Sequence, residues 1–368
     1  MLARFINKII GVIFRSLKKW SLFPPEPDSW DTEKRILLVC IAGVGDNLLC
    51  TPVARAIKKS FPDSYLAFMA HRKRQDVLAN IPTLDEIIPY HKGIFSFFQL
   101  AHQLRKRRFN RVLIFHSTHG DLLPLCYMSR AHRIIGFREK NPLNFLLTET
   151  IPHDPKIHTI EDRLHLAEKI GIHSDDYKMD WQILPKEREE AENLFKQHNL
   201  IGQPKVIGFQ LGTGPIRRRW PLEYYVELGQ MIANRFGVYP ILLGSENEKP
   251  LLKKAHFLMG EKSPILITDL RICGAIIEKL DLMIAPNTGP MHIAIALNIP
   301  LISLFGSANH HIYGPFPPSL TQVVMCKNNI WGESSVEGMK LIKPSEVMQK
   351  VEEIFSLTIE ERGISKTN

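Results

Sequence analysis

The chain has 368 residues, of which 44% are hydrophobic, and a formal charge of +9. This composition is that of a globular protein, and the length favours two domains. The charge belongs partly to one end of the chain, because residues 1–20 contain five basic and no acidic residues. A nucleic-acid-binding protein distributes its basic residues over a reading surface, and no zinc-finger or RNP spacing occurs here. We therefore expect no nucleic-acid partner.

The five cysteines are scattered, odd in number and never spaced as C-x-x-C. This pattern predicts neither a disulfide framework nor a zinc site, and it is typical of reduced thiols in the cytoplasm. No apolar run reaches the roughly 18 residues that a membrane-spanning helix needs, and no signal-peptidase site follows the N-terminal segment. The sequence therefore predicts a cytoplasmic protein without a membrane span.

Residues 1–20 are predicted to form a basic amphipathic helix, followed by a stiff proline-rich linker over residues 21–30. We expect this helix to lie at the surface of the inner membrane, with its apolar face among acyl chains and its basic face at anionic head groups. The alternative is a helix that packs on the body of the protein. Its apolar face holds Leu2, Phe5, Ile6, Ile9, Ile13, Leu17 and Trp20, and its basic face holds Arg4, Lys8, Arg15 and Lys18.

Strands and helices alternate twice, first over residues 31–185 and again over residues 186–343. This alternation predicts an α/β protein with two tandem Rossmann-like domains, whose ligand-binding strand ends face an interdomain cleft. A helix at 344–355 opens the last segment, 344–368, and the sequence does not show whether it returns to the first domain. Strands are expected at 35–41, 65–70, 111–116, 133–137, 206–211, 239–243, 265–269, 281–285 and 301–305. Helices are expected at 47–60, 95–107, 121–129, 159–170, 186–198, 222–235, 246–257, 271–279 and 289–298.

A glycine-containing turn, residues 42–48, follows the first strand. The dinucleotide fingerprint G-x-G-x-x-G fails there at Leu48, and basic residues 71–74 replace the acid expected after the second strand. No Walker motif occurs either, so nicotinamide chemistry and phosphoryl transfer are disfavoured. Asp46 remains as a carboxylate beside the predicted cleft. It suits a general base for a hydroxyl nucleophile, and the alternative is a capping residue of the following helix.

A second loop, residues 210–214, follows the first strand of the second domain and leads into three consecutive arginines. Thr213 offers a hydroxyl donor, and Arg217 and Arg218 can neutralise a diphosphate without a metal ion. The alternative is a solvated basic surface. Glu246 follows the next strand and can accept hydrogen bonds from a ribose or a base, or serve only as an acid near a helix start.

The stretch 285–292 joins a predicted buried strand to a short helix with Pro290 in its first turn. Free N–H groups and the positive end of the helix dipole favour a phosphate or diphosphate at such a turn. The alternative is a well-capped helix of an α/β core. His292, one turn into the helix, can orient a donor phosphate or satisfy a buried carbonyl.

Together these motifs resemble glycosyltransferase family 9, the heptosyltransferases of lipopolysaccharide synthesis that use ADP-heptose. The resemblance covers most of residues 34–316. Its motifs are Gly45-Asp46 with Thr51-Pro52, the basic segment that ends in Trp220-Pro221, Gly244-Ser245-Glu246, Asn287-Thr288-Gly289-Pro290-Met291-His292, Leu304-Phe305-Gly306 and Tyr313-Gly314-Pro315.

The resemblance implies a GT-B fold and transfer with inversion, without a divalent metal or another cofactor. It implies that Asp46 is the base, that Arg218 contacts the donor phosphate and that Glu246 meets the nucleoside. The remaining donor-binding residues are then Thr213, Arg217, Asn287, Thr288, Gly289 and His292. Asn287 stands where members often carry an aspartate, and residues 307–311 lack the usual Pro-Thr-Asp-Pro. An amide thus replaces an acidic contact to the donor sugar.

The sequence therefore predicts an inverting glycosyltransferase that moves a sugar, heptose by resemblance, from a nucleotide diphosphate onto a lipopolysaccharide core or related glycolipid. Its partners would be the nucleotide sugar, the glycolipid and the inner-membrane surface, where it would be peripheral. Basic residues of the first domain suit an anionic acceptor or a solvated surface: Arg72, Arg105, Arg107 and Arg108. Two alternatives remain, a noncatalytic protein that binds nucleotide sugars or glycolipids, and a GT-B nucleotide-sugar epimerase.

Overall fold

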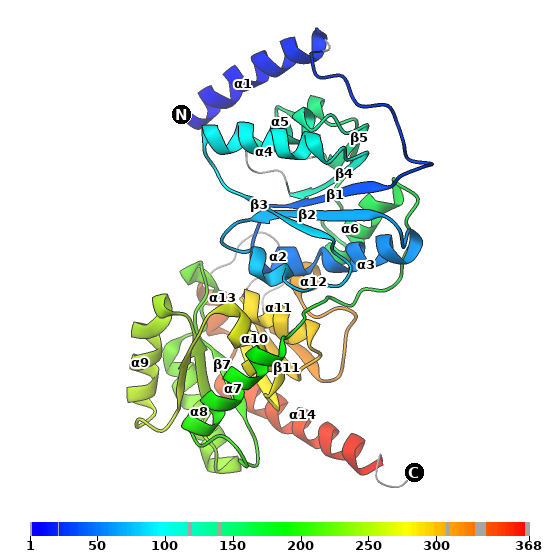
Figure 1. Cartoon of the computed structure of the whole chain (residues 1–368). Coiled ribbons are helices and arrows are strands. Elements are labelled where there is room, and N and C mark those ends of the chain that lie inside the picture. The colour runs from blue at the N-terminus through cyan, green and yellow to red at the C-terminus, as the bar shows by residue number, and fades with distance from the viewer. Residues whose placement is uncertain are drawn as a thin grey trace. The chain divides into compact units, whose positions relative to one another are not determined.

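The computed structural model describes residues 2–20, 22–116, 120–138, 141–306, 310–327 and 336–364. The chain divides into two compact units, Met1–Met179 and Asp180–Asn368. Each unit is built on a parallel six-stranded sheet, and many of the elements are labelled in Figure 1. The two tandem α/β units are confirmed, with a boundary somewhat before the predicted residue 185.

The sheet of the first unit has the strand order β3-β2-β1-β4-β5-β6. Its central strands are apolar runs that are buried on both faces, as parallel strands between helix layers are. The edge strands β3 and β6 were not predicted, because they are short and carry polar residues or proline. The strands are β1 (Arg35–Cys40), β2 (Tyr65–His71), β3 (Glu86–Tyr90), β4 (Arg111–His116), β5 (Arg133–Phe137) and β6 (Glu149–Ile151).

Helices cover both faces of this sheet: α1, α4 and α5 lie on one side and α2, α3 and α6 on the other (Figure 1). The single helix predicted over 47–60 is wrong, since two helices, α2 and α3, occupy this region. Pro52 lies in the first turn of α3, where a missing N–H is tolerated, so a new helix begins there. The helices are α1 (Leu2–Lys19), α2 (Val44–Leu48), α3 (Thr51–Ser60), α4 (Ile94–Lys106), α5 (Leu122–Met128) and α6 (Thr159–Glu168).

The N-terminal helix α1 packs on the first unit. Phe14 is buried in the apolar core, its ring 6.1 Å from that of Tyr127, and Ile10 and Leu17 pack against the same core. The alternative in which the helix packs on the protein body is therefore what the structure shows. No helix among the described residues combines the length and the apolar character needed to cross a bilayer.

The sheet of the second unit has the order β12-β11-β10-β7-β8-β9, so its strands are arranged as in the first sheet. The strands are β7 (Ile207–Gln210), β8 (Ile241–Gly244), β9 (Ile265–Ile267), β10 (Leu282–Pro286), β11 (Leu301–Phe305) and β12 (Gln322–Cys326). The helices are α7 (Pro185–Gln197), α8 (Leu222–Phe236), α9 (Lys249–Leu258), α10 (Leu270–Glu278), α11 (Gly289–Ala296), α12 (His310–Tyr313), α13 (Val336–Lys340) and α14 (Pro344–Ile364).

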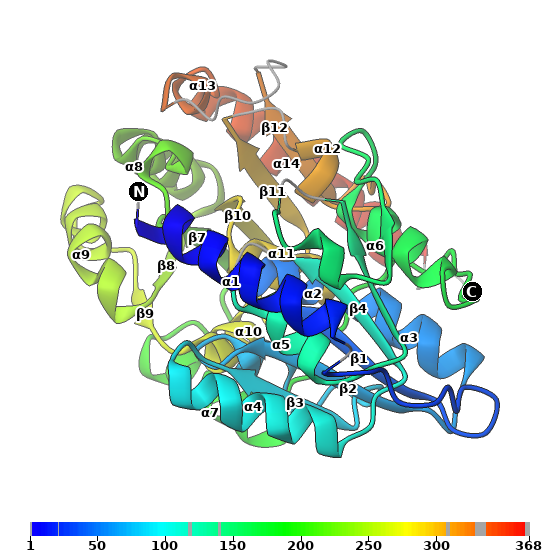
Figure 2. The ribbon, with the colours of Figure 1, turned by 90° about the horizontal axis from the view of Figure 1, so that it is seen from above.

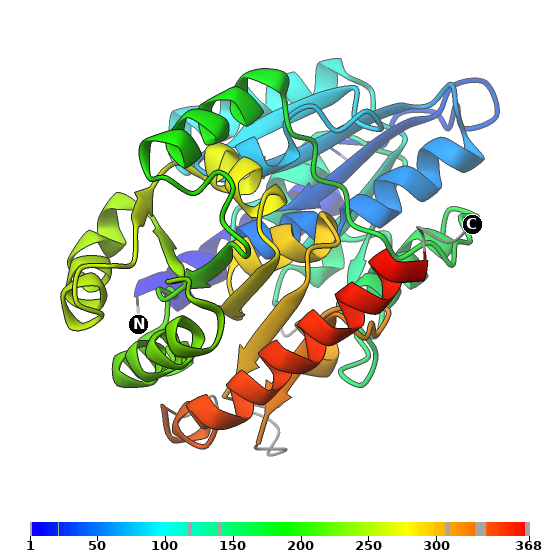
Figure 3. The same ribbon diagram turned by 90° about the horizontal axis from the view of Figure 1, so that it is seen from below.

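The last helix, α14, belongs to the second unit (Figure 3, red). Val347, Val351 and Ile354 are almost fully buried in the core of this unit, and the ring of Phe355 lies 5.2 Å from that of Phe236 on α8. The apolar side of α14 is thus used to close the second core. The possibility that this helix crosses back to the first domain is not realised in these contacts.

Candidate active site

Both sheets reverse their strand order at one point, between β1 and β4 in the first and between β7 and β10 in the second. Loops at the carboxyl ends of the strands diverge at such a point and leave room for a ligand. The turn with Asp46 follows β1, and the loop with Thr213 follows β7. Thr288 follows β10, so the candidate donor-binding loops of the second unit are neighbours at its reversal point.

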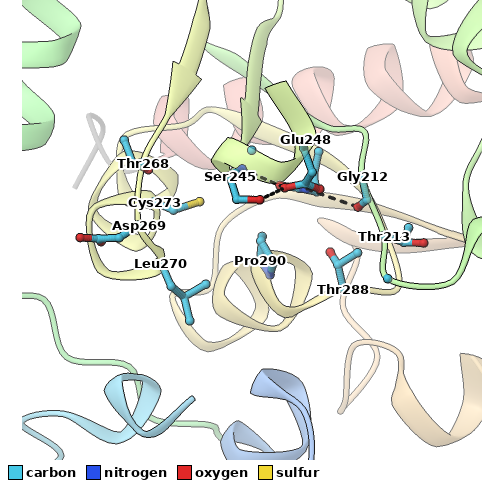
Figure 4. Close-up of a pocket in the computed structure, with 13 residues that line it drawn as sticks. Gly212, Thr213, Ser245, Glu248, Thr268, Asp269, Leu270, Cys273, Thr288 and Pro290 are labelled. Atoms are coloured by element: carbon cyan, nitrogen blue, oxygen red, sulfur yellow. Dashed lines mark hydrogen bonds between the residues drawn. The ribbon is translucent and has the colours of Figure 1, made fainter. Parts of the chain in front are cut away.

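A pocket of about 310 Å³ lies within the second unit at this point (Figure 4). Four consecutive strand-to-helix loops build it, those after β7, β8, β9 and β10. Thr213 and Thr288 are the predicted donor-binding residues that line it. The full lining consists of Gln210, Gly212, Thr213, Gly214, Gly244, Ser245, Glu248, Thr268, Asp269, Leu270, Cys273, Thr288 and Pro290.

A network of polar side chains forms one wall of this pocket. The amide Nε2 of Gln210 donates to Oε1 of Glu248 at 3.1 Å, and the backbone N–H and hydroxyl of Ser245 both donate to Oε2 of Glu248 at 2.8 Å. The carbonyl Oε1 of Gln210 is buried without a hydrogen-bond partner. Since an unpaired buried acceptor is costly, this oxygen is available for a donor group on a ligand.

Glu248 is the acid that follows β8 in this pocket, whereas the sequence pointed to Glu246; the other lining acid, Asp269, caps α10. The side chain of Glu246 is 73% exposed and pairs with Lys249 at 3.1 Å, outside the pocket lining. Ser245 and Glu248 form a capping box, in which the acid three residues after the serine turns back to the start of the helix. The S-x-x-E spacing was the signal in the sequence that could have identified Glu248.

Gly212 is required by the close approach of Glu248. A Cβ atom at Gly212 would lie 1.5 Å from Oε1 of Glu248, whereas one at Gly214 would meet no atom within 4 Å. We expect Gly212→Ala to displace Glu248 and to weaken donor binding at least about tenfold, as a lost charge-assisted hydrogen bond would. Calorimetric titration with the donor measures this loss. Gly214→Ala adds the same methyl group to the same pocket loop without meeting Glu248 and should cost clearly less affinity; an equal loss in both variants would contradict the role of Glu248.

The helix α11 opens directly on the pocket, with Thr288 as its N-cap residue and Pro290 in its first turn. The hydroxyl of Thr288 donates to the Pro286 carbonyl at 3.2 Å and makes no capping bond, so first-turn N–H groups stay uncapped by this side chain. Gly289 and Asn287 are half-buried beside the lining residues, and His292 is 4% exposed on α11. This arrangement suits an anion at the helix start.

The arginine segment lies next to the loop after β7, in a short 3-10 turn, η3 (Ile216–Arg218). Arg217 is exposed and Arg218 is half-buried. Within the described part of the chain, neither guanidinium forms an ion pair. Both cations are therefore available for an anionic ligand, and neither belongs to the lining of the pocket itself.

Two neighbours hold this segment in place. Nη2 of Arg219 donates to the Thr213 carbonyl at 3.3 Å, and its buried Nε has no partner, so Arg219 joins the arginines to the pocket loop. The indole of Trp220 donates to the Ile342 carbonyl at 2.9 Å and packs on Tyr225 with ring centroids 4.8 Å apart. Sequence reasoning singled out Arg217 and Arg218 and left out the positioning role of Arg219.

Asp46 lies in α2 and is held by two groups of the first unit. Its Oδ2 accepts the Gly43 N–H at 3.0 Å, and its Oδ1 lies 3.5 Å from Nη2 of Arg163. Nη1 of Arg163, a buried residue, also donates to the Asp46 carbonyl. The side chain of Asp46 remains 35% exposed. The carboxylate thus has a helix-capping role and is at the same time oriented and accessible.

The predicted acceptor-binding arginines lie at opposite edges of the first sheet. Arg72 is exposed directly after β2, at the edge where Asp46 lies. Arg107 follows α4, where the chain has returned to the amino edge. There its Nε donates to Glu86 at 2.7 Å, its carbonyl accepts from Arg35, and the guanidinium lowers the pKa of Glu86. Since a helix between parallel strands runs antiparallel to them, Arg105 and Arg108 at the end of α4 also lie at the amino edge, opposite Asp46.

Cys273 is the sulfur group of the pocket. Burial, together with the nearby Glu248 and Asp269, raises its pKa to about 12. It is therefore a neutral thiol at physiological pH and no nucleophile. In the described parts of the chain, no three His, Cys, Asp or Glu side chains gather as potential metal ligands.

Two Rossmann-like units with the same strand order, one with an oriented carboxylate and the other with a polar pocket at a helix start, define a glycosyltransferase with the GT-B fold. The sequence profile of glycosyltransferase family 9 (heptosyltransferase) matches residues 97–338. The protein belongs to this family. Membership of a glycosyltransferase family supports an enzyme and not the noncatalytic alternative.

Curated relatives extend the similarity over most of the chain. This chain is 25% identical over 296 residues to the lipopolysaccharide core heptosyltransferase OpsX of Haemophilus influenzae. The aligned region covers 76% of this chain and 81% of the relative. The chain is 24% identical over 298 residues to lipopolysaccharide heptosyltransferase 2 of Escherichia coli K12, covering 75% and 83%.

Solved structures share the fold. A family 9 glycosyltransferase from Veillonella parvula superposes with a TM-score of 0.77 at 21% identity, over 87% of this chain and 97% of that chain. The ADP-heptose lipopolysaccharide heptosyltransferase II of E. coli gives a TM-score of 0.73 at 21% identity, over 89% and 99%. Of the predicted departures from the family pattern, Ser307, Ala308 and Asn309 lie outside the described residues.

Proposed function

We propose that this enzyme transfers heptose from ADP-heptose to a hydroxyl of a lipopolysaccharide core or related glycolipid, with inversion at the anomeric carbon. The names of its relatives support the sugar and the acceptor class. The observation that carries the proposal is the carboxylate of Asp46, oriented by Gly43 and Arg163 at the carboxyl end of β1 and accessible to solvent.

In the proposed reaction, Asp46 accepts the proton of the acceptor hydroxyl as the oxygen attacks the anomeric carbon. The new C–O bond forms on the face opposite the leaving ADP, and the bond from the anomeric carbon to the diphosphate oxygen breaks. General-base assistance of this kind contributes about 10²- to 10⁴-fold to the rate. The proton remains on Asp46 until water removes it.

The donor would occupy the pocket of the second unit. Gln210 and Glu248 present acceptors for the hydroxyl or amino groups of the nucleoside. The diphosphate would lie at the start of α11, where Arg217 and Arg218, which have no ion-pair partner among the described residues, would stabilise the charge that develops on departure. The hydroxyl of Thr213 donates to the Pro215 carbonyl at 2.6 Å and would have to turn from it to donate to the diphosphate. Asn287 would bond the sugar hydroxyls through its amide. We propose that no divalent metal takes part, so a chelator should leave the rate unchanged.

Purified full-length protein, incubated with ADP-heptose and a core glycolipid, tests the proposal. Mass analysis should show an acceptor heavier by one heptose, and GDP- and UDP-sugars should give no product. Conversion of the donor without an acceptor would instead identify an epimerase. Absence of a product with every donor, while one donor binds, would refute transfer. A rate abolished by chelation and restored by a divalent ion would refute the metal-free mechanism.

Arg163 is expected to act through Asp46 as a positioning residue. Arg163→Met removes the bonds to the Asp46 carbonyl and carboxylate. We expect kcat to fall about tenfold with the donor KM unchanged, since charged hydrogen bonds contribute about 1.5–3 kcal/mol. Arg163→Lys should restore part of kcat. A matched loss of thermal stability in both variants, without this split between kcat and KM, would indicate a purely structural role.

A further inference from the structure

The exposed apolar side chains of the first unit are concentrated on two helices. Among the residues described in this unit, each exposed large apolar side chain belongs to α1, to the residues just after it, or to α4. Phe95 is 90% exposed and Trp20 is 72% exposed, so these side chains are not edges of the core. The complete set is Val12, Ile13, Trp20, Leu22, Ile94, Phe95 and Phe98.

Both helices lie on the same side of the first sheet (Figures 1 and 2). The core-facing side of α1 is supplied by Ile10, Phe14 and Leu17, and that of α4 by Leu100 and Leu104. The exposed apolar residues therefore take no part in packing the two helices onto the core. The two interpretations of the N-terminal helix are compatible, because one side of α1 packs on the body and another carries apolar residues to the surface.

The charge on these helices has one sign. Neither α1 nor α4 contains an aspartate or glutamate. Lys19 is exposed at the end of α1, beside Trp20, and Lys92 is exposed just before α4, whereas the ammonium of Lys18 donates to the Phe145 carbonyl. A surface that combines exposed aromatic and aliphatic side chains with lysines and no acid is complementary to an anionic bilayer.

We propose that this surface docks on an anionic lipid membrane, and we call it the α1–α4 face. It consists of Val12, Ile13, Lys19, Trp20, Leu22, Lys92, Ile94, Phe95 and Phe98. Phe95, Phe98 and Ile94 enter the boundary between head groups and acyl chains, and Trp20 lies at the level of the head groups. The lysines contact anionic lipid phosphates. A symmetric contact between two copies of the chain would instead bring like charges together.

This inference goes beyond the proposed function and is independent of the sugar, because binding to lipid is measured without donor or acceptor. It changes the sequence-based expectation in one respect. The sequence assigned the membrane contact to α1 alone, whereas the structure adds the aromatic start of α4. A glycolipid acceptor embedded in the same bilayer would then be reached from a docked enzyme.

Co-sedimentation of the full-length protein with vesicles tests the proposal. The wild type should bind vesicles of phosphatidylcholine with phosphatidylglycerol, bind phosphatidylcholine alone weakly, and be released by high salt. The triple variant Ile94→Ser/Phe95→Ser/Phe98→Ser should lower the partition coefficient at least about tenfold, since three exposed apolar side chains are lost. Lys19→Glu/Lys92→Glu should lower it by about tenfold or more. Unchanged circular dichroism and Tm establish that the variants fold.

The matched control is Phe257→Ser/Leu320→Ser, two side chains of the second unit that are 69% and 77% exposed. It should bind vesicles as the wild type does. Wild-type binding by the triple variant, or an equal loss in the control, would overturn the proposal. A third result would also overturn the proposal: the wild type does not bind anionic vesicles but forms a dimer in sedimentation velocity, and the triple variant does not form this dimer. The face would then join two copies of the chain.

Discussion

Asp46→Asn is expected to lower kcat about a thousandfold, within the range that a general base contributes, and to leave donor binding unchanged. The amide has the shape of the carboxylate and can still accept the Gly43 N–H, but it cannot take the acceptor proton. Steady-state kinetics with glycolipid and calorimetric titration of the donor separate the two effects. A variant that transfers sugar at the wild-type rate would remove Asp46 from the mechanism.

The control for this substitution is Asp63→Asn, which makes the same chemical change on an exposed turn of the same unit. It should leave both kcat and donor binding at wild-type values. If Asp46→Asn also lowered the Tm markedly, the capping bond to Gly43 would account for part of the loss. Single-turnover rates of the folded fraction would then give the part of the loss in kcat that is due to catalysis and not to unfolding.

The double variant Arg217→Ala/Arg218→Ala is expected to lower kcat/KM for the donor at least about a hundredfold. Each charge-assisted hydrogen bond to a phosphate contributes about 1.5–3 kcal/mol, and these cations have no ion-pair partner among the described residues that would compensate their loss. Affinity for ADP, measured by calorimetry, should fall together with kcat. An unchanged ADP affinity with an unchanged rate would show that the arginines form a solvated surface.

Lys253→Ala/Lys254→Ala removes two adjacent exposed cations from α9 in the same unit and should have no effect. This control shows whether the effect of the arginine variant comes from lost contacts with the donor phosphates or only from the lower net charge of the protein. Arg218→Lys adds a test of geometry, because lysine keeps the charge but loses the planar fork that binds two phosphate oxygens. An intermediate kcat/KM is expected for that variant.

Periodicity predicted the central strands of both sheets, because buried parallel strands such as β1 and β10 are uninterrupted apolar runs. It missed three of the four edge strands, β3, β6 and β12, and predicted the fourth, β9. The missed strands are short or contain polar residues or proline, and each pairs with a single neighbouring strand. The break between α2 and α3 was also missed. Pro52 was visible in the sequence, but the pattern of apolar residues continues across it.

The candidate site was predicted best where residues directly follow strands. Thr213 and Thr288 line the pocket, because parallel strand ends meet at one edge and bring their loops together. Prediction was poorer where helix geometry intervenes. Glu246 and Glu248 differ by less than one helical turn, and the hydrogen bonds from Ser245 and Gln210 direct Glu248 inward. The sequence did not show that Arg105, Arg107 and Arg108 lie at the edge of the first sheet opposite Asp46, because that placement follows from the direction of α4.

The pocket is lined by residues of the second unit alone, and Asp46 with its two supporting groups belongs to the first. In the proposed mechanism, selectivity for the nucleotide sugar and activation of the acceptor would therefore be encoded in separate, uninterrupted halves of the gene. Substitutions that alter one can accumulate without disturbing the residues that build the other. Exchange of the segment after residue 179 between relatives is thus a direct route to hybrid enzymes that join the acceptor of one to the donor of another.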